Sequence, residues 1–440
     1  MAKYFGTDGI RGVVNQDLTC LLAYNVGKSL AIYLKKHKKT LSVLIGKDTR
    51  VSGDMLAYSF ASGLCDYGVT AKMIGIVPTG CVSYLASKLD VGAGVMITAS
   101  HNAPNMNGIK LINNKGYKFT CLEEQEIETY IDKNVAASKN KGNIIHAKEL
   151  VNTYTNFLVS EVGCDLSGVN LAVDTAFGSC FKIAEDVLKK LNANVVLINN
   201  DAYGEKINVN CGALNVEKLK DEVKLHKCDF GFAFDGDADR LIVVLKNGRV
   251  LNGDDLLFVL ASYMLKTNKL NSRVVVGTIM TNSGTEQSFK NLGINLIRTD
   301  VGDRNVIEAM LKKNYCLGGE SSGHICVSTL NTTCDALLNA LFLLKIVITE
   351  NIDLNEFLLH LQKVPQTIKN VNVSRQVRLN FDKNLLLKKQ IEKIEKSYPE
   401  LRVVVRPSGT ENVIRIMVEG NELKTNDAIL KIEQLLKENI

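Results

Sequence analysis

Three aspartates, Asp235, Asp237 and Asp239, lie within five residues, directly after an apolar run. Carboxylates spaced this closely repel one another unless a cation lies among them. Oxygen ligands with no histidine or cysteine beside them favour Mg²⁺. An EF-hand is excluded, because its sixth and twelfth loop positions would be Arg240 and Lys246 instead of glycine and glutamate. The pattern therefore predicts a magnesium site at the end of a strand, with a solvated acidic turn as the alternative.

A second candidate is Ser100, which follows the apolar run 94–97 and precedes His101. A serine at the end of a buried strand can be an exposed nucleophile, although the local pattern is also typical of a capping residue. After a predicted turn at 107–108 the chain returns as a strand, so we expect Lys110 to fold back beside the serine. A lysine there would stabilise phosphoryl charge or accept a proton.

A third candidate is the turn Arg406-Pro407-Ser408-Gly409-Thr410, followed by Arg415 on the next predicted strand. It offers hydroxyls, successive backbone N–H groups and two guanidinium groups, which suit a phosphate dianion. A plain turn with exposed arginines is the alternative.

A fourth candidate is the glycine-flanked loop 318–324. Its acid, Glu320, and its hydroxyls, Ser321 and Ser322, are groups that hydrogen-bond to sugar hydroxyls. An ordinary surface loop would have the same composition.

The composition excludes several classes of protein. Hydrophobic residues make up 46% and charged residues 23%, which is typical of a globular chain and not of a disordered one. The net charge of +6 is mild, and the basic run 35–39 has no aromatic or glycine-rich companion, so nucleic-acid binding is not expected. The most apolar segment, 336–349, is interrupted by Asn339 and Lys345 and is shorter than the ~20 residues of a membrane span.

Missing motifs narrow the chemistry further. Neither a G-x-x-x-x-G-K-[ST] loop nor a G-x-G-x-x-G fingerprint occurs, so nucleotide and nicotinamide cofactors have no support. The 11 cysteines are odd in number and form no C-x-x-C pair, so neither a disulfide framework nor a zinc site is expected. Because the N-terminal residues do not resemble a secretory signal, we expect a cytoplasmic protein with reduced thiols.

The elements that must position these groups follow an α/β pattern, in which short β-branched runs alternate with helical periodicity. Buried strands are predicted at 41–45, 73–76, 171–174, 195–198, 231–234 and 274–277. Amphipathic helices are predicted at 54–67, 179–191, 254–266 and 283–292. A separate α+β domain is predicted at the end, with strands at 368–373, 401–405 and 413–419, a helix at 384–398 and a last helix. The loop-like joins suggest domains at 1–155, 156–253, 254–368 and 369–440.

In this order and over essentially the whole chain, these motifs resemble the α-D-phosphohexomutase superfamily. The string Tyr4-Phe5-Gly6-Thr7-Asp8-Gly9-Ile10-Arg11-Gly12 is similar to its amino-sugar branch in particular. The other matching strings lie at 98–102, 235–240, 298–304, 319–324, 331–333, 406–410 and 414–419.

The resemblance implies a fold and an activity. The fold is three related mixed α/β domains and a smaller C-terminal α+β domain around a central active-site cleft. The activity is that of a magnesium-dependent isomerase, which interconverts glucosamine 6-phosphate and glucosamine 1-phosphate through a phosphoserine and glucosamine 1,6-bisphosphate. Such an enzyme supplies amino-sugar nucleotide and cell-wall precursor synthesis. The resemblance also implies that the partner is a small sugar phosphate, that the protein binds neither nucleic acid nor membranes, and that it often forms a homodimer.

The resemblance also implies a role for each candidate residue. Ser100 carries the phosphoryl group, and one Mg²⁺ is bound by Ser100, Asp235, Asp237 and Asp239. Catalysis involves Ser100 together with Arg11, His101, Lys110, Arg240 and His324. The substrate is bound by Glu320, Ser321, Ser322, Arg406, Ser408, Gly409, Thr410 and Arg415.

The chain departs from the family pattern at three places. Ala103-Pro104 stands where proline usually follows the asparagine directly, Ser321 stands where the amino-sugar branch commonly has glutamine, and Asn412 stands where proline is usual. Three alternatives therefore stay open. These are a phosphomannomutase or phosphoglucomutase, a metal-dependent phosphatase that transfers the phosphoryl group to water, and a catalytically silent sugar-phosphate sensor.

Overall fold

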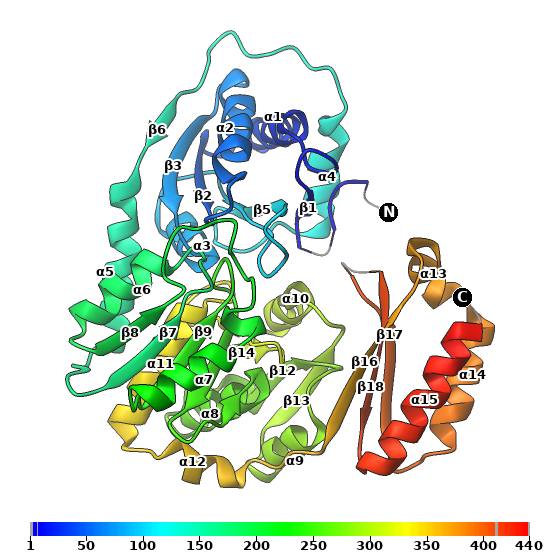
Figure 1. Cartoon of the computed structure of the whole chain (residues 1–440). Coiled ribbons are helices and arrows are strands. Elements are labelled where there is room, and N and C mark those ends of the chain that lie inside the picture. Colours follow the sequence, from blue (N-terminus) through cyan, green and yellow to red (C-terminus); the bar gives the residue numbers. More distant parts are fainter. Residues whose placement is uncertain (1–2, 7, 410–411, 439–440) are drawn as a thin grey trace.

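Four β-sheets organise the described part of the chain, each with helices packed on it (Figure 1). The computed structural model describes residues 3–6, 8–409 and 412–438. We number domains I to IV after the four sheets in chain order.

The strands of each sheet are as follows. Domain I has the order β1-β5-β4-β2-β3-β6, with β1 (Ile10–Val13), β2 (Ser42–Lys47), β3 (Thr70–Ile76), β4 (Ala93–Ile97), β5 (Met106–Asn113) and β6 (Ile144–His146). Domain II has the order β11-β10-β9-β7-β8, with β7 (Asn170–Asp174), β8 (Asn194–Ile198), β9 (Phe230–Phe234), β10 (Leu241–Leu245) and β11 (Val250–Leu251). Domain III has the order β13-β12-β14-β15, with β12 (Val274–Thr278), β13 (Asn295–Thr299), β14 (Leu317–Gly319) and β15 (Ile325–Val327). Domain IV has the order β16-β18-β17, with β16 (Gln366–Asn372), β17 (Arg402–Pro407) and β18 (Val413–Glu419).

Domains I, II and III repeat one strand pattern. The strands β3-β2-β4, β8-β7-β9 and β13-β12-β14 are parallel, and β5, β10 or β15 then pairs antiparallel with the last of the three. Domain IV is antiparallel throughout. The prediction of three related α/β domains and a smaller α+β domain is confirmed. As a consequence, the β4–β5, β9–β10 and β14–β15 loops hold equivalent positions in their sheets.

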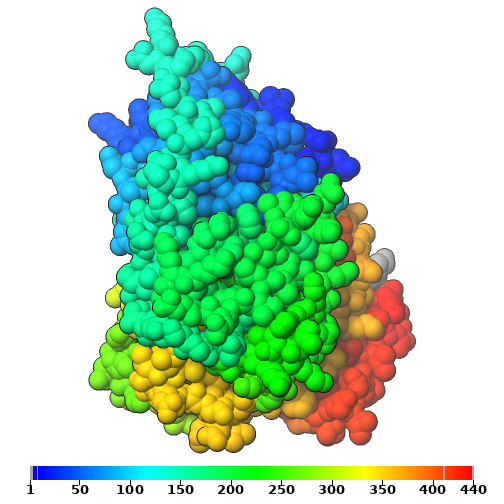
Figure 2. Space-filling model, turned by 60° about the vertical axis from the view of Figure 1, so that its left-hand side comes forward, coloured from blue at the N-terminus to red at the C-terminus, as the bar shows by residue number. Residues whose placement is uncertain are grey.

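The helices cover these sheets and share a core across domain borders. Domain I has α1 (Cys20–Lys36), α2 (Gly53–Asp66), α3 (Thr79–Lys88) and α4 (Cys121–Ile131), and domain II has α5 (Val151–Val162), α6 (Phe181–Lys190) and α7 (Glu217–Leu225). Domain III has α8 (Gly253–Lys266), α9 (Ser283–Asn291), α10 (Asp303–Lys313), α11 (Ala336–Glu350) and α12 (Leu354–Phe357), and domain IV has α13 (Arg375–Asn380), α14 (Leu385–Lys396) and α15 (Glu422–Glu438). Figure 2 shows domain II in green against domain I in blue, with the link from α4 to α5 running over this face.

The most apolar segment of the sequence forms α11, which is buried over most of its length. One hydrophobic core joins this helix to residues of domains I and II, such as Val82 and Leu158. Every helix within the described ranges is too short or too polar to cross a membrane. The predicted strands and helices are present with ends shifted by a few residues, as for the run 73–76 inside β3 and the helix 384–398 around α14.

Domain III contains a buried acid, Asp254, whose protonation makes the stability of the fold depend on pH. Asp254, in the first turn of α8, accepts the backbone N–H of Asn282 through Oδ2 at 2.9 Å, while its buried Oδ1 has no hydrogen-bond partner among the described residues. Burial raises the pKa of Asp254 to about 6. Because the folded chain then keeps this proton to a higher pH than the unfolded chain, folding loses stability as the pH rises from about 4 to about 6.

We predict that Asp254→Asn gains stability over the wild type through that pH interval, reaching about 1–3 kcal/mol above pH 6, since one pKa unit is worth ~1.4 kcal/mol. Urea unfolding of both proteins at several pH values measures the difference. Asp221→Asn, on the exposed side of α7, is the control. A gain that does not change with pH would contradict the assignment.

Candidate active site

Ser100 meets the acidic loop (residues 235–240) of domain II, although the two are far apart in sequence. Its Oγ donates a hydrogen bond of 2.8 Å to Asp235 Oδ2, across a separation of 135 residues. Gly236 lies directly against the carbonyl oxygen of Ser100, where a Cβ atom would come within 2.6 Å of that oxygen. The expectation of an exposed nucleophile is wrong for this structure, because packing of the acidic loop leaves Ser100 only 1% exposed.

The acidic loop has the geometry of a metal site. Asp235, Asp237 and Asp239 each place a carboxylate oxygen within 4.8 Å of the others, and all three are buried. Asp237 Oδ1 is buried without a hydrogen-bond partner among the described residues, which is costly unless a cation binds it. Burial, followed by the charges of Asp239 and Asp237, raises the pKa of Asp235 to about 7. Three converging buried carboxylates fit a hard divalent cation.

Lys110, on β5, neutralises part of this charge. Its Nζ lies 2.8 Å from Asp237 Oδ2 and 3.0 Å from Asp239 Oδ2. Burial disfavours the lysine charge, but Asp237 and Asp239 outweigh it and raise the pKa of Lys110 well above its usual value. Lys110 was predicted to fold back beside Ser100. In the structure its ammonium group pairs with Asp237 and Asp239, in the acidic loop that Ser100 contacts.

Asp8 joins the cations of domain I into one cluster, and the sequence analysis assigned it no role. It forms ion pairs with Arg11, Lys110 and Lys118. Arg11 also donates to Asn102 Oδ1 at 2.9 Å, which links the cluster to the loop after Ser100. Asp8 lies inside the string that resembles the family, but a single acid between a threonine and a glycine has no local signal of its own.

The β14–β15 loop of domain III reaches the acidic loop through His324. Its Nε2 lies 2.9 Å from Asp239 Oδ1, and its Nδ1 lies 3.1 Å from Glu320 Oε2. Burial disfavours the imidazolium, but Asp239 and Glu320 outweigh it and raise the pKa of His324 to about 10. Ser322 Oγ lies 3.3 Å from His324 Nδ1, whereas the carbonyl of Ser321 accepts the N–H of Gly253.

His101 and Arg240 lie between Ser100 and His324. The Nδ1 atom of His101 is 3.4 Å from Ser100 Oγ and 2.8 Å from a terminal nitrogen of Arg240. Arg240 Nε is 3.3 Å from His324 Nε2. Burial, together with Arg240 and Arg11, lowers the pKa of His101 to about 2, so this imidazole is neutral.

The serine loop (residues 98–106) is held by Arg50, which the sequence analysis did not single out. This buried guanidinium donates to four backbone carbonyl oxygens, namely those of Ser100, Asn102, Ala103 and Met106. Its Nε also pairs with Asp48 Oδ2 at 3.0 Å. Ser100 has a φ of 51°, a left-handed conformation that costs energy for a residue with a side chain. By donating to these carbonyl oxygens, Arg50 helps to stabilise the turn at Ser100.

Domain IV presents the predicted phosphate loop towards the same region. Arg406 is in electrostatic reach of Glu320, and burial followed by the charge of Arg415 lowers its pKa. Arg378, on α13, donates to the carbonyl oxygens of Ser408 and Gly409 at 3.2 and 3.0 Å. Arg378 is a further residue that the sequence analysis missed. Thr410, which was predicted to bind phosphate, lies outside the described residues.

We predict that the acidic loop binds a divalent cation in solution. Mg²⁺ at about a hundred times its dissociation constant should stabilise the fold by about 2.7 kcal/mol, measured as a rise in the thermal midpoint. Asp237→Asn should weaken binding at least about tenfold, because it removes one anionic ligand. Asp201→Asn, exposed in the same domain, should leave the response unchanged. An undiminished response in Asp237→Asn would exclude this site.

We also predict that Arg50→Lys loosens the serine loop. A lysine can still pair with Asp48, but it has fewer N–H donors, and each buried carbonyl left without a donor costs about 1–3 kcal/mol. Hydrogen–deuterium exchange should become faster in residues 98–106, and the free energy of unfolding should fall. Arg375→Lys, exposed on α13, is the control. Wild-type exchange in the loop of Arg50→Lys would show that Arg50 does not hold it.

Family models match almost the whole chain. They are described as phosphoglucomutase/phosphomannomutase alpha/beta/alpha domain I over residues 2–138, domain II over 148–248, domain III over 252–364, and the C-terminal domain over 361–433.

Curated proteins named phosphoglucosamine mutase are similar over the full length. The protein of Alkaliphilus oremlandii is 40% identical, with 100% of both chains covered. The protein of Thermoanaerobacter sp. is 41% identical, with 100% of this chain and 98% of the relative covered. The protein of Clostridioides difficile is 40% identical, with 99% and 100% covered.

Solved structures share the fold. A phosphoglucomutase/phosphomannomutase family protein from Burkholderia thailandensis has a TM-score of 0.83 at 22% identity, with 100% of this chain and 98% of that chain covered. An Aspergillus fumigatus N-acetylphosphoglucosamine mutase in complex with glucose 1,6-bisphosphate has a TM-score of 0.71 at 17% identity, with 100% and 96% covered. The family models and the full-length relatives show that the chain belongs to the phosphoglucomutase/phosphomannomutase family, among its phosphoglucosamine mutases, and is a phosphomutase of the isomerase class.

Proposed function

We propose that the chain interconverts glucosamine 6-phosphate and glucosamine 1-phosphate through phospho-Ser100 and glucosamine 1,6-bisphosphate. One Mg²⁺ would be held by Asp235, Asp237, Asp239 and the Ser100 side chain. The contact between Ser100 Oγ and Asp235 carries the proposal, because it joins a hydroxyl that can be esterified to the carboxylates of the metal site. The full-length relatives named phosphoglucosamine mutase support the amino sugar as substrate.

The chemistry is an exchange of phosphoryl groups between two oxygens. When bound, Mg²⁺ would neutralise charge on the transferring group. The Oγ–P bond of phospho-Ser100 breaks as the free hydroxyl oxygen of the sugar bonds to phosphorus. The proton that this hydroxyl loses is regained by Ser100 Oγ, so the serine ends in the form described above, donating to Asp235. The bisphosphate then turns over, and the reverse exchange restores phospho-Ser100 and releases the isomer.

The remaining residues bind and orient the substrate in this proposal. The distal phosphate is held by Arg406, Ser408, Gly409, Thr410 and Arg415. The sugar hydroxyls are recognised by Glu320, Ser321 and Ser322. Charge at the transfer point is balanced by Arg11, Lys110, Arg240 and His324. The neutral His101, whose Nδ1 lies 3.4 Å from Ser100 Oγ, orients the reacting oxygen. We also propose a cytoplasmic location with small sugar phosphates as partners, and the homodimer stays a prediction.

We predict that Ser100→Ala lowers mutase turnover by at least about a thousandfold, because the phosphoryl carrier is lost. The assay supplies glucosamine, glucose and mannose 6-phosphates side by side, and phosphorus NMR reads the product position. Ser62→Ala, exposed on α2, should keep full activity. Unchanged turnover in Ser100→Ala would contradict the mechanism. Free phosphate formed in step with turnover would indicate a phosphatase, and preference for glucose or mannose phosphate would overturn the substrate.

A further inference from the structure

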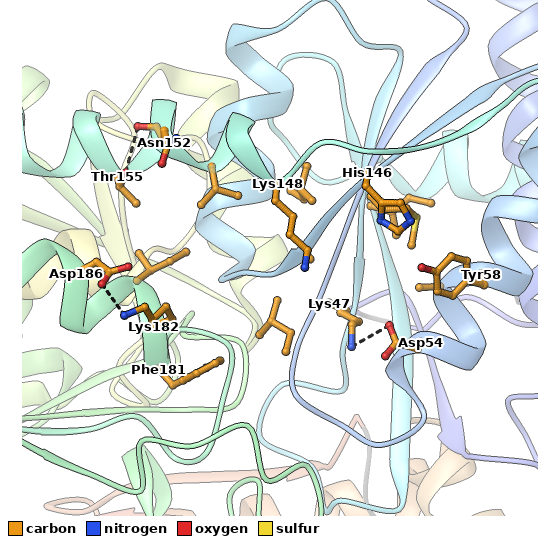
Figure 3. Close-up of a pocket in the computed structure, with 18 of the residues that line it drawn as sticks. Lys47, Asp54, Tyr58, His146, Lys148, Asn152, Thr155, Phe181, Lys182 and Asp186 are labelled. Atoms are coloured by element: carbon orange, nitrogen blue, oxygen red, sulfur yellow. Dashed lines mark hydrogen bonds and ion pairs between the residues drawn. The ribbon is translucent and has the colours of Figure 1, made fainter.

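A second hollow lies between domains I and II and shares no lining residue with the candidate active site (Figure 3). Its volume is about 760 Å³, within the size range of small-molecule sites. One side is formed by the carboxyl ends of the parallel strands β2, β3 and β6, the edge at which α/β folds commonly bind ligands. Helices α5 and α6 of domain II form the other side.

The net charge of this hollow is positive. Five lysines line it, namely Lys47, Lys148, Lys182, Lys189 and Lys190, against two aspartates, Asp54 and Asp186. The aspartates each pair with one lysine, since Lys47 lies 3.1 Å from Asp54 and Lys182 lies 2.9 Å from Asp186. Lys189 pairs with Glu185, which lies outside the lining.

Lys148 is the cation best placed for a ligand. Its side-chain ammonium group makes no hydrogen bond or ion pair with any other described residue, and Figure 3 shows the side chain extending into the hollow between Lys47 and Lys182. Its aliphatic stem passes over Gly75, so that a Cβ atom added to Gly75 would lie 3.5 Å from Cε of Lys148. An anion bound here would therefore meet at least one cation that no carboxylate already neutralises.

The walls beside these cations are apolar and include aromatic rings. Tyr58 and His146 lie edge to face, with ring centroids 6.4 Å apart, and Phe181 lines the opposite side. Ile74 and Ile76 of β3 also line the hollow. A ligand that fits this lining combines a flat, apolar ring, which the aromatic side chains can contact, with at least two negative charges, which the lysines can bind.

We propose that this hollow binds a nucleoside diphosphate, with its phosphates on Lys148, Lys47 and Lys182 and its base against the aromatic rings. The missing nucleotide motifs do not conflict with this, because those motifs build phosphate sites from glycine-rich backbone, whereas this one consists of lysine side chains. The ligand would touch the β2–α2 segment, in which Lys47 and Asp54 flank the residues that hold the serine loop.

The test is calorimetric titration of the full chain with UDP and with ADP, in the presence of saturating glucose 1,6-bisphosphate to fill the candidate active site. Both nucleotides should bind, and uridine and pyrophosphate should each bind at least about tenfold more weakly, since each carries only half of the recognised groups. Lys148→Glu should weaken UDP binding at least about tenfold, and Lys148→Ala should weaken it less. Lys312→Glu, exposed on α10, is the matched control for the change in net charge.

Several outcomes would overturn the proposal. These are no binding up to about 1 mM nucleotide, equal weakening by Lys148→Glu and Lys312→Glu, and pyrophosphate that binds as tightly as UDP. Hydrogen–deuterium exchange locates the contact independently of the variants. Protection by UDP in residues 47–58 and 146–155 supports the site, and protection confined to the serine and acidic loops excludes it.

Discussion

The burial of several carboxylates around one hydroxyl is the constraint on which the rest of the structure depends. Asp237 and Asp239 lose the water that would stabilise their charges, and such desolvation costs several kcal/mol for each ion. Lys110 offsets that cost from domain I, and His324 offsets it from domain III, while the acidic loop belongs to domain II. The charge balance therefore exists only when the three domains are packed together. Asp237 Oδ1, which has no hydrogen-bond partner among the described residues, is available to bind one more cation.

A strand pattern used three times explains why these groups meet. In each of the first three domains, the third strand of the parallel trio (β4, β9 or β14) leads through a loop into an antiparallel strand, and this loop carries the polar groups. The β4–β5 loop supplies a hydroxyl, the β9–β10 loop supplies carboxylates, and the β14–β15 loop supplies Glu320 and His324. The β17–β18 hairpin of domain IV adds arginines on the fourth side. Equivalent positions thus carry complementary chemistry.

The β2–α2 segment links the candidate active site to the second hollow. Arg50 binds four carbonyl oxygens of the serine loop, while Lys47 and Asp54 of the same segment line the hollow. A short segment that touches both places has little freedom to move, because its ion pair between Arg50 and Asp48 is fully buried. Whatever binds in the hollow is therefore in contact with the support of Ser100.

Part of the structure was predictable from the sequence, because it depends on residues that are close together in the chain. Strand and helix periodicity predicted the α/β fold and the α+β tail, because those patterns depend on which side of an element is buried. The repulsion within Asp235, Asp237 and Asp239 is local in the same way, so a metal site was predictable. The likeness to a known family, and not any local pattern, linked Ser100 to this loop.

Only the tertiary structure decided which distant groups touch. The burial of Ser100 depends on how domain II packs over domain I, and no residue near Ser100 in sequence records that packing. Arg50 was not predictable because its acceptors are backbone carbonyl oxygens, which every residue possesses. Asp8 was missed because an acid becomes informative only when the cations around it, Arg11, Lys110 and Lys118, are brought in by the fold. Side-chain types and their spacing set what chemistry is available, whereas electrostatic balance between domains sets where it takes place.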